Sequence, residues 1–175
     1  MDGWMDSKVA TFPLLKLGIK PDRVILETKP HPKHSGKLDS TLVDGKWAGL
    51  DRGEKEYLGF INQDCQVLFQ FDNPRKLSQL TISFLEDVGP GVLAPEYVEV
   101  WGGEDKNNLK KLGRVVGALP QEGRPSAKNI IKINFPPQSV RFVRLTAKNV
   151  KTLPAWHALQ KTDKASIFVD EVALE

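Results

Sequence analysis

Residues 140–175 read VRFVRLTAKNVKTLPAWHALQKTDKASIFVDEVALE and hold the pattern that decides the fold. Near the start of this stretch, apolar residues at 143, 145 and 147 alternate with polar residues at 144, 146 and 148. That period of two predicts a half-buried strand. The closing SIFVDEVALE, residues 166–175, is apolar on both faces and predicts another strand. A long polar loop, 148–164, separates the two.

The same alternation recurs along the earlier part of the chain, whereas helix signals are sparse. It predicts strands near residues 65–71, 80–84, 98–101 and 131–135, with weaker candidates at 24–27 and 109–116. Turn signals lie between these segments, at 72–74, 89–91, 102–105 and 136–137, where proline or glycine suits a reversal of the chain. One short helix is predicted near 38–43. About eight strands with such turns favour an antiparallel sandwich or barrel.

Composition describes an ordinary globular protein. The 175 residues favour one domain, and 25 basic against 22 acidic residues give a net charge of +3. The basic residues are scattered, which argues against a nucleic-acid partner. No apolar run approaches the roughly 18 residues of a membrane span. Cys65 is the only cysteine and stands in the alternating run CQVLFQF, so a core position is expected.

Three stretches in order resemble one family. They are LVDGKWAG at 42–49 followed by YLGFINQDCQVLFQFD at 57–72, then LSQLTISFLEDVGPGVLAPEYVEVWG at 77–102, and then residues 140–175. This order is similar to the discoidin, or coagulation-factor type C, domain in its bacterial form, which includes family 32 carbohydrate-binding modules and C-terminal modules of bacterial hexosaminidases. The resemblance covers about residues 38–175. Residues 1–37 have no counterpart and are expected to form a lead-in with one possible strand. LQKTDKAS at 159–166 stands where relatives have a glycine-rich turn.

The resemblance implies an all-β fold, an eight-stranded antiparallel jelly-roll sandwich of the galactose-binding-like type. The strand count agrees but alone would not separate this fold from an immunoglobulin-like sandwich. The resemblance further implies a non-catalytic carbohydrate-binding module that binds glycans. Such a module is an accessory domain of a glycoside hydrolase or cell-surface protein within a larger multidomain chain. An extracellular, periplasmic or cell-surface location follows from the same likeness, and composition does not separate it from the cytoplasm.

The Asp-Gly pair at 44–45 is a turn signal, and the resemblance adds a calcium site to it. Calcium takes about six to eight oxygen ligands, many of them carbonyls of a flexible loop. Carried over from the family, the ligands are the carboxylates of Asp44 and Glu171 and the carbonyls of Thr41, Lys46 and Gly49. Gly49 stands where relatives often have a hydroxyl. A carboxylate on the mostly apolar last strand needs a partner or a metal, because an unpaired buried charge is costly.

Aromatic residues in loops are the candidates for sugar binding, because sugars stack on flat rings while polar groups hold their hydroxyls. Trp101 alternates away from the face of its strand that carries the valines, and Trp156 and His157 stand in the polar loop. Tyr57 precedes a core strand, and Arg144 is a candidate hydrogen-bond donor. Core packing remains the alternative for each tryptophan and is favoured for Trp47.

Two other classes of function stay open at this stage. An enzyme is disfavoured, because the chain has no GxSxG, HExxH or P-loop motif and a lone His157 does not make a nucleophilic site. A protein- or lipid-binding adhesion or assembly module is the main alternative. It would need an apolar spike at a loop tip, for which VGPGVL at 88–93 is the candidate.

Overall fold

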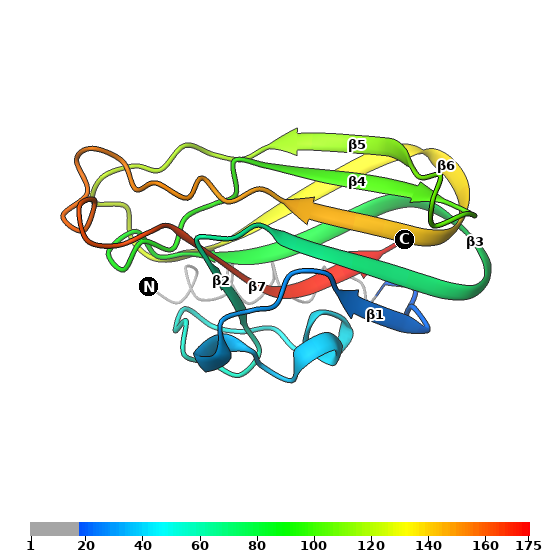
Figure 1. Cartoon of the computed structure of the whole chain (residues 1–175), viewed down its shortest axis with the longest axis horizontal. Coiled ribbons are helices and arrows are strands. Elements are labelled where there is room, and N and C mark those ends of the chain that lie inside the picture. The colour runs from blue at the N-terminus through cyan, green and yellow to red at the C-terminus, as the bar shows by residue number, and fades with distance from the viewer. Residues whose placement is uncertain (1–17) are drawn as a thin grey trace, which may run out of the picture.

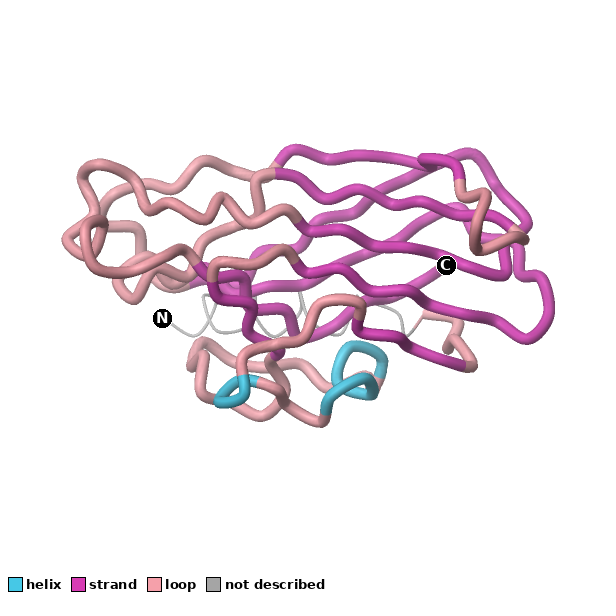
Figure 2. The backbone as a smooth tube through the Cα atoms, viewed as in Figure 1, coloured by secondary structure: helices cyan, strands magenta, loops and turns pink. Residues whose placement is uncertain are grey.

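The computed structural model describes residues 18–175, which fold as a β-sandwich (Figures 1 and 2). It has seven strands and two short 3-10 helices in this part of the chain. In order they are β1 (Arg23–Leu26), η1 (Pro32–His34), η2 (Leu38–Val43), β2 (Leu58–Ile61), β3 (Cys65–Glu86), β4 (Tyr97–Gly103), β5 (Lys110–Val116), β6 (Ala127–Ala147) and β7 (Ser166–Leu174). All pairings between these strands are antiparallel.

Strands β3 and β6 are long enough to belong to both layers. The first part of β3 pairs with β1 and with the last part of β6, which in turn pairs with β4, and β4 with β5. The last part of β3 pairs with β7 and with the first part of β6, and β7 pairs with β2. One layer is therefore β1-β3-β6-β4-β5 and the other is β2-β7-β3-β6, and Figure 1 shows the first layer toward the viewer.

The crossing between layers is where the sequence predicted two turns. Instead of reversing, β3 bends at 72–74 and β6 bends at 136–137, and their register shifts between Gln70 and Arg75. Proline cannot donate to a ladder, so it is tolerated where pairing is interrupted. The predicted pairs of short strands, 65–71 with 80–84 and 131–135 with 143–147, are thus single bent strands.

The core fills the space between the layers with the inward residues of the alternating runs. Cys65, Val67 and Phe69 of β3 are fully buried, as are Val143 and Leu145 of β6, which confirms the predicted faces. The strand β2, LGFI, was missed, because four residues that are almost all buried show no alternation. The all-β antiparallel sandwich is confirmed, with seven strands among residues 18–175 where about eight were predicted for the chain.

The predicted lead-in covered residues 1–37, of which 1–17 lie outside the described residues, and the part from residue 18 onward contributes to the sandwich. Val24 and Leu26 of β1 pack against the core, and the Ile19 amide donates to the Leu174 carbonyl (2.6 Å), so this segment lies beside the last strand. The predicted helix at 38–43 is confirmed as η2. Gly45 follows it with a φ of 75°, a left-handed conformation that glycine adopts without strain, so Asp44-Gly45 does make the predicted turn.

Candidate functional site

A hollow lies at the end of the sandwich where the long loops gather. Its volume is about 380 Å³, and its lining comes from the turn after β3, the 117–126 loop and the 148–165 loop. The lining residues are Val88, Gly89, Glu122, Gly123, Arg124, Trp156, His157 and Ala158. Figure 2 shows these loops grouped at one end of the molecule. We call this the loop-end hollow.

Trp156 is the aromatic residue of the loop-end hollow, and 39% of its surface is exposed. An indole that lines a hollow and keeps part of its surface open offers a flat apolar face to a ligand. The predicted place of Trp156 in the long loop 148–164 is confirmed.

His157 holds this loop in place. The side chain is buried, its Nε2 lies 2.5 Å from the Val88 carbonyl oxygen, and its Nδ1 accepts from the Leu159 amide (3.0 Å). Because Nδ1 accepts, the proton is on Nε2, which donates to Val88. Both ring nitrogens are thus used within the protein. His157 lines the hollow as a positioning residue, and the prediction that it bonds a ligand directly is not what its contacts favour.

A second anchor of the same loop is Asn149, which is 1% exposed. Its Nδ2 lies within hydrogen-bond distance of the carbonyls of Phe60, Gln63 and Ala165, and its Oδ1 accepts from the Lys151 amide. A buried amide with its polar atoms satisfied fixes both ends of the loop at once.

Arg124 and Glu122 bring polar groups into the hollow, and no sequence signal identified them. The Arg124 Nη1 lies 3.4 Å from Oε2 of Glu86, a buried carboxylate that also accepts from the Asn129 side chain. The arginine side chain keeps 36% exposure, so part of it faces solvent. Arg124 stands in a Gly-Arg-Pro segment that reads as an ordinary loop, and only the fold brings it to Trp156.

Trp101 and Arg144 lie elsewhere. They are opposite each other in the β4–β6 register, on the outer side of the first layer, and neither lines the loop-end hollow. Trp101 Nε1 donates to Glu99 (3.1 Å), and Arg144 makes two contacts with the carboxylate of Glu27 at 2.7 and 3.0 Å. The predicted outward direction of Trp101 is correct, but the structure does not bring these two residues together with Trp156.

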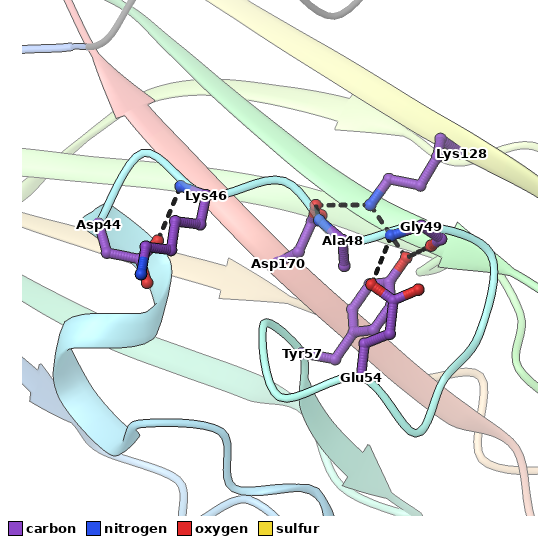
Figure 3. A network of polar contacts seen from close by, with 8 residues as sticks. All are labelled: Asp44, Lys46, Ala48, Gly49, Glu54, Tyr57, Lys128 and Asp170. Carbon is purple, nitrogen blue, oxygen red and sulfur yellow. Dashed lines mark hydrogen bonds and ion pairs between the residues drawn. The ribbon is translucent and has the colours of Figure 1, made fainter.

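Tyr57 is fully buried, so the prediction that it stacks on a sugar is wrong. Its ring packs edge-on against Phe168, its hydroxyl donates to the Gly49 carbonyl, and Lys128 Nζ donates to that hydroxyl (3.0 Å; Figure 3). Burial raises the pKa of the Tyr57 phenol. The residue looked like a loop residue in sequence, but the 44–57 segment folds over it.

The network around Tyr57 is centred on a buried ion pair. Lys128 Nζ lies 2.6 Å from Oδ2 of Asp170, which also accepts from the Ala48 amide (3.0 Å; Figure 3). The two side chains are 6% and 0% exposed. Burial lowers the pKa of Lys128 and raises that of Asp170, while their close contact opposes both shifts. The pair ties the 44–57 segment to β7 and β6.

The predicted calcium residues Asp44 and Glu171 do meet. They line one hollow of about 360 Å³, together with Val43, Val172 and residues 18–21. Asp44 Oδ1 accepts from the Lys46 amide (2.9 Å), whereas Asp44 Oδ2 and Glu171 Oε1 are buried without a hydrogen-bond partner. Burial raises the pKa of Glu171 to about 8, against a bond from the Gly45 amide that lowers it. Within residues 18–175, Lys37 forms an ion pair with Asp44, with Nζ 3.7 Å from Oδ2.

Of the other predicted calcium ligands, Thr41 and Lys46 lie near Asp44 and Gly49 does not. Thr41 is buried in η2, three residues before Asp44, and its hydroxyl accepts from the Lys37 amide (2.6 Å). Lys46 follows the turn. The Gly49 carbonyl is wrong as a ligand, because it accepts from the Tyr57 hydroxyl and lies away from Asp44, on the other side of Ala48 in Figure 3. Within residues 18–175, no group of three or more His, Cys, Asp or Glu side chains is placed to hold a metal.

The fold is similar to those of several solved carbohydrate-binding modules. The family 32 module of AlyQ, solved with 4,5-unsaturated mannuronic acid, has a TM-score of 0.55 at 14% identity, covering 91% of this chain and 98% of that one. A pectin-binding carbohydrate-binding module has a TM-score of 0.55 at 13% identity over 89% of this chain and 91% of its own. A module from Clostridium perfringens, CpGH89CBM32-5, solved with GalNAc-β-1,3-galactose, has a TM-score of 0.52 at 16% identity over 86% and 92%.

The fold is that of a family 32 carbohydrate-binding module. The expected galactose-binding-like sandwich is thereby confirmed. At the level of sequence, no family model and no curated protein matches the chain. At 13–16% identity, the likeness shows the arrangement of the strands alone.

The sequence predicted no membrane span. Across residues 18–175, no helix is long and apolar enough to cross a bilayer. The apolar spike predicted at 88–93 is wrong, because Val88, Val92 and Leu93 are buried under the loops instead of standing at a tip.

Proposed function

We propose that this chain is a non-catalytic carbohydrate-binding module that holds a sugar in the loop-end hollow. The observation that carries the proposal is Trp156, a partly exposed indole beside the side chains of Arg124 and Glu122. A sugar offers C–H groups to the ring and hydroxyls to the polar groups, and this combination of one aromatic face with a few polar atoms suits it.

The comparison supports the same class of ligand. The AlyQ and Clostridium perfringens modules are solved with sugars, and one further neighbour binds pectin. Another solved chain combines the AlyQ module with an alginate lyase domain, and the match covers 34% of that chain. We therefore propose that the present module serves as an accessory domain of a carbohydrate-active or cell-surface protein, acting outside the cytoplasm.

A role in binding rather than catalysis follows from the lining of the hollow. Glycoside hydrolysis by the usual route needs a pair of carboxylates that flank the scissile bond. Of the described residues that line the loop-end hollow, Glu122 alone carries a carboxylate. A small open site of this kind is expected to bind with a dissociation constant between about 10 µM and a few mM.

A titration of the ¹⁵N-labelled protein with a panel of neutral and acidic monosaccharides tests the proposal. At least one sugar is expected to shift the Trp156 indole resonance, and Trp156→Ala is expected to abolish binding with little change in stability. Leu119→Ala is the matched control, since Leu119 is 84% exposed on the neighbouring loop and does not line the hollow. If the panel shifts no resonance of the hollow, or if Trp156→Ala binds as the parent does, the sugar site is wrong.

We further propose a structural calcium ion held by Asp44 and Glu171, with the carbonyls of Thr41 and Lys46 as further ligands. The support is the pair of buried carboxylate oxygens without partners that line one hollow. Oxygen ligands of this kind are what calcium prefers. The ion would bind the two carboxylate oxygens that lack a hydrogen-bond partner and would tie the turn after η2 to β7.

Thermal unfolding with and without calcium tests this second proposal. After chelation, calcium at about 100 times its dissociation constant is expected to add about 2.7 kcal/mol to the free energy of unfolding. Asp44→Asn and Glu171→Gln are expected to remove the gain, whereas Asp39→Asn, a change on the exposed side of η2, is expected to retain it. Equal melting temperatures with chelator and with excess calcium would contradict the proposal.

A further inference from the structure

Three aromatic side chains lie on the outer, solvent-facing side of the layer β1-β3-β6-β4-β5. Tyr97 and Trp101 of β4 and Phe142 of β6 alternate with buried residues, so they point away from the core, and each is partly exposed. Solvent-facing strand positions are ordinarily polar. We call this surface the aromatic face. In Figure 1 it faces the viewer, and no described element crosses over it.

The strand register shows which residues lie beside these rings. Trp101 lies opposite Arg144 on β6 and opposite Lys111 on β5. One strand pair farther, Arg144 lies opposite Leu68 of β3. Phe142 lies opposite Gly103, so its ring has no side chain beside it on β4. Phe142 is therefore diagonal to Trp101, and diagonal neighbours in a sheet lie roughly 7–8 Å apart, within reach of aromatic side chains.

Cations accompany the rings. The Arg114 guanidinium carbon lies 4.0 Å from the centre of the Tyr97 ring, and Lys111 Nζ lies 6.0 Å from the centre of the Trp101 ring. Both distances fall in the range of cation–π attraction. The aromatic face therefore presents flat apolar surfaces with positive charge next to them.

The negative charges of the aromatic face are already engaged. Glu27 is bound by Arg144 at 2.7 Å, and Glu99 is bound by Arg114 at 3.3 Å and by the Trp101 indole. Lys111 and Arg23, which stands on the outward side of β1, have no ion pair with any residue of 18–175. The strand register places four basic residues on this face, Arg23, Lys111, Arg114 and Arg144, against the two acidic residues Glu27 and Glu99. Asp22 and Asp72 lie at its edge next to Arg23, where the Asp72 amide donates to the Asp22 carboxylate. The middle of the face is therefore positive, so it complements an anionic ligand.

We propose that the aromatic face is a second binding surface, which takes an extended acidic polysaccharide such as a chain of uronic acids. The sugar rings stack on Trp101 and Phe142, and their carboxylates pair with Lys111 and Arg23. A flat face on the side of a sheet suits several units within a chain, whereas the loop-end hollow suits a single unit. This inference extends the proposed function to a surface that shares no residue with the hollow.

Electrophoresis in gels containing polygalacturonate tests the proposal, with methyl-esterified polygalacturonate as the uncharged comparison. The parent protein is expected to be retarded by the acid form and much less by the ester. Trp101→Ala is expected to weaken retardation by roughly tenfold and Lys111→Gln by at least about threefold. Lys132→Gln is the matched control, because it removes the same charge from an exposed position on the other layer and is expected to bind as the parent does.

Two further comparisons decide between outcomes. Trp156→Ala is expected to keep its retardation by polygalacturonate, so failure of the sugar site in the hollow and failure of this surface give different results. A single-stranded oligonucleotide of equal charge is expected to compete poorly. If it competes as well as polygalacturonate, or if Lys111→Gln and Lys132→Gln lose binding equally, the face is a general polyanion surface and the proposal is overturned. Urea midpoints of all variants establish that Trp101→Ala is folded, and Lys111→Gln carries the test if it is not.

Discussion

The side chain of Lys128 lies in the interior of the sandwich, where its positive charge is paired with the carboxylate of Asp170. Because Asp170 is fully buried and lies 2.6 Å from Lys128 Nζ, removal of the lysine leaves a carboxylate without a counter-charge. Lys128→Met is expected to lower the free energy of unfolding by about 3–5 kcal/mol, measured by urea denaturation. The double change Lys128→Met with Asp170→Asn is expected to recover most of that loss. An equal loss in the single and double variants would show that packing and not charge sets the cost.

Glu171 is expected to make stability depend on pH. Its pKa in the fold is about 8, against an ordinary value of 4.5, because burial disfavours the charged form. Between about pH 4.5 and 8 the folded chain keeps a proton that the unfolded chain has released, so stability falls as pH rises through this window and levels off above it. In the presence of a chelator, Glu171→Gln is expected to flatten the fall. Identical pH profiles for parent and variant, measured by chemical denaturation, would contradict this account.

At the residue scale, alternation in the sequence is a reliable guide and position in a loop is not. Trp101 was placed outward because its neighbours in the strand point inward, and the structure agrees. Tyr57 lies outside any alternating run, so its direction could not be predicted, and the segment that precedes it covers its ring. Arg124 joins Trp156 only because two loops distant in sequence meet, and nothing local to Arg124 encodes that meeting.

At the scale of elements, the 148–165 loop shows how a long connection becomes a fixed wall of a site. Asn149 anchors its ends and His157 anchors its middle to the Val88 carbonyl. His157→Ala is expected to cost about 1–2 kcal/mol of stability. It is also expected to lose most sugar binding although Trp156 is untouched, because the indole is no longer held. Titration of the variant by NMR measures this.

His157→Gln supplies the control for that loop. A glutamine amide can donate to the Val88 carbonyl in place of Nε2, so partial recovery of both stability and binding is expected. If His157→Ala binds sugar as the parent does, the loop does not depend on this contact and the positioning role is wrong.

The strands illustrate what the sequence could and could not supply. Periods of two located most of β3, β4 and β6, because one of their faces is buried and the other is not, whereas β7 is buried on both faces and was predicted from its apolar run. The joining of 65–71 to 80–84 could not be foreseen, since Asp72-Asn73-Pro74 reads as a reversal when its strand neighbours are unknown. β2 is buried along nearly its whole length, so it offered no period to detect.

At the scale of the whole molecule, β3 and β6 make the two layers a single cooperative body. Each strand supplies pairs to both layers, so neither layer can lose its ladder while the other keeps it. Unfolding in urea is expected to be one transition, with tryptophan fluorescence and far-ultraviolet circular dichroism giving the same midpoint. Separate midpoints for the two probes would show that the layers unfold independently.

The same strands also determine how the molecule responds to mechanical load. The loop-end hollow lies at one end of the strands, and β7 runs from those loops to Leu174, toward the opposite end (Figure 1). A pulling force between a captured glycan and Leu174 therefore acts along the strands, across the direction of their hydrogen bonds. Bonds loaded in shear must rupture together instead of unzipping one by one. The strands are therefore expected to resist a force applied between the loop-end hollow and Leu174 better than a force applied across them.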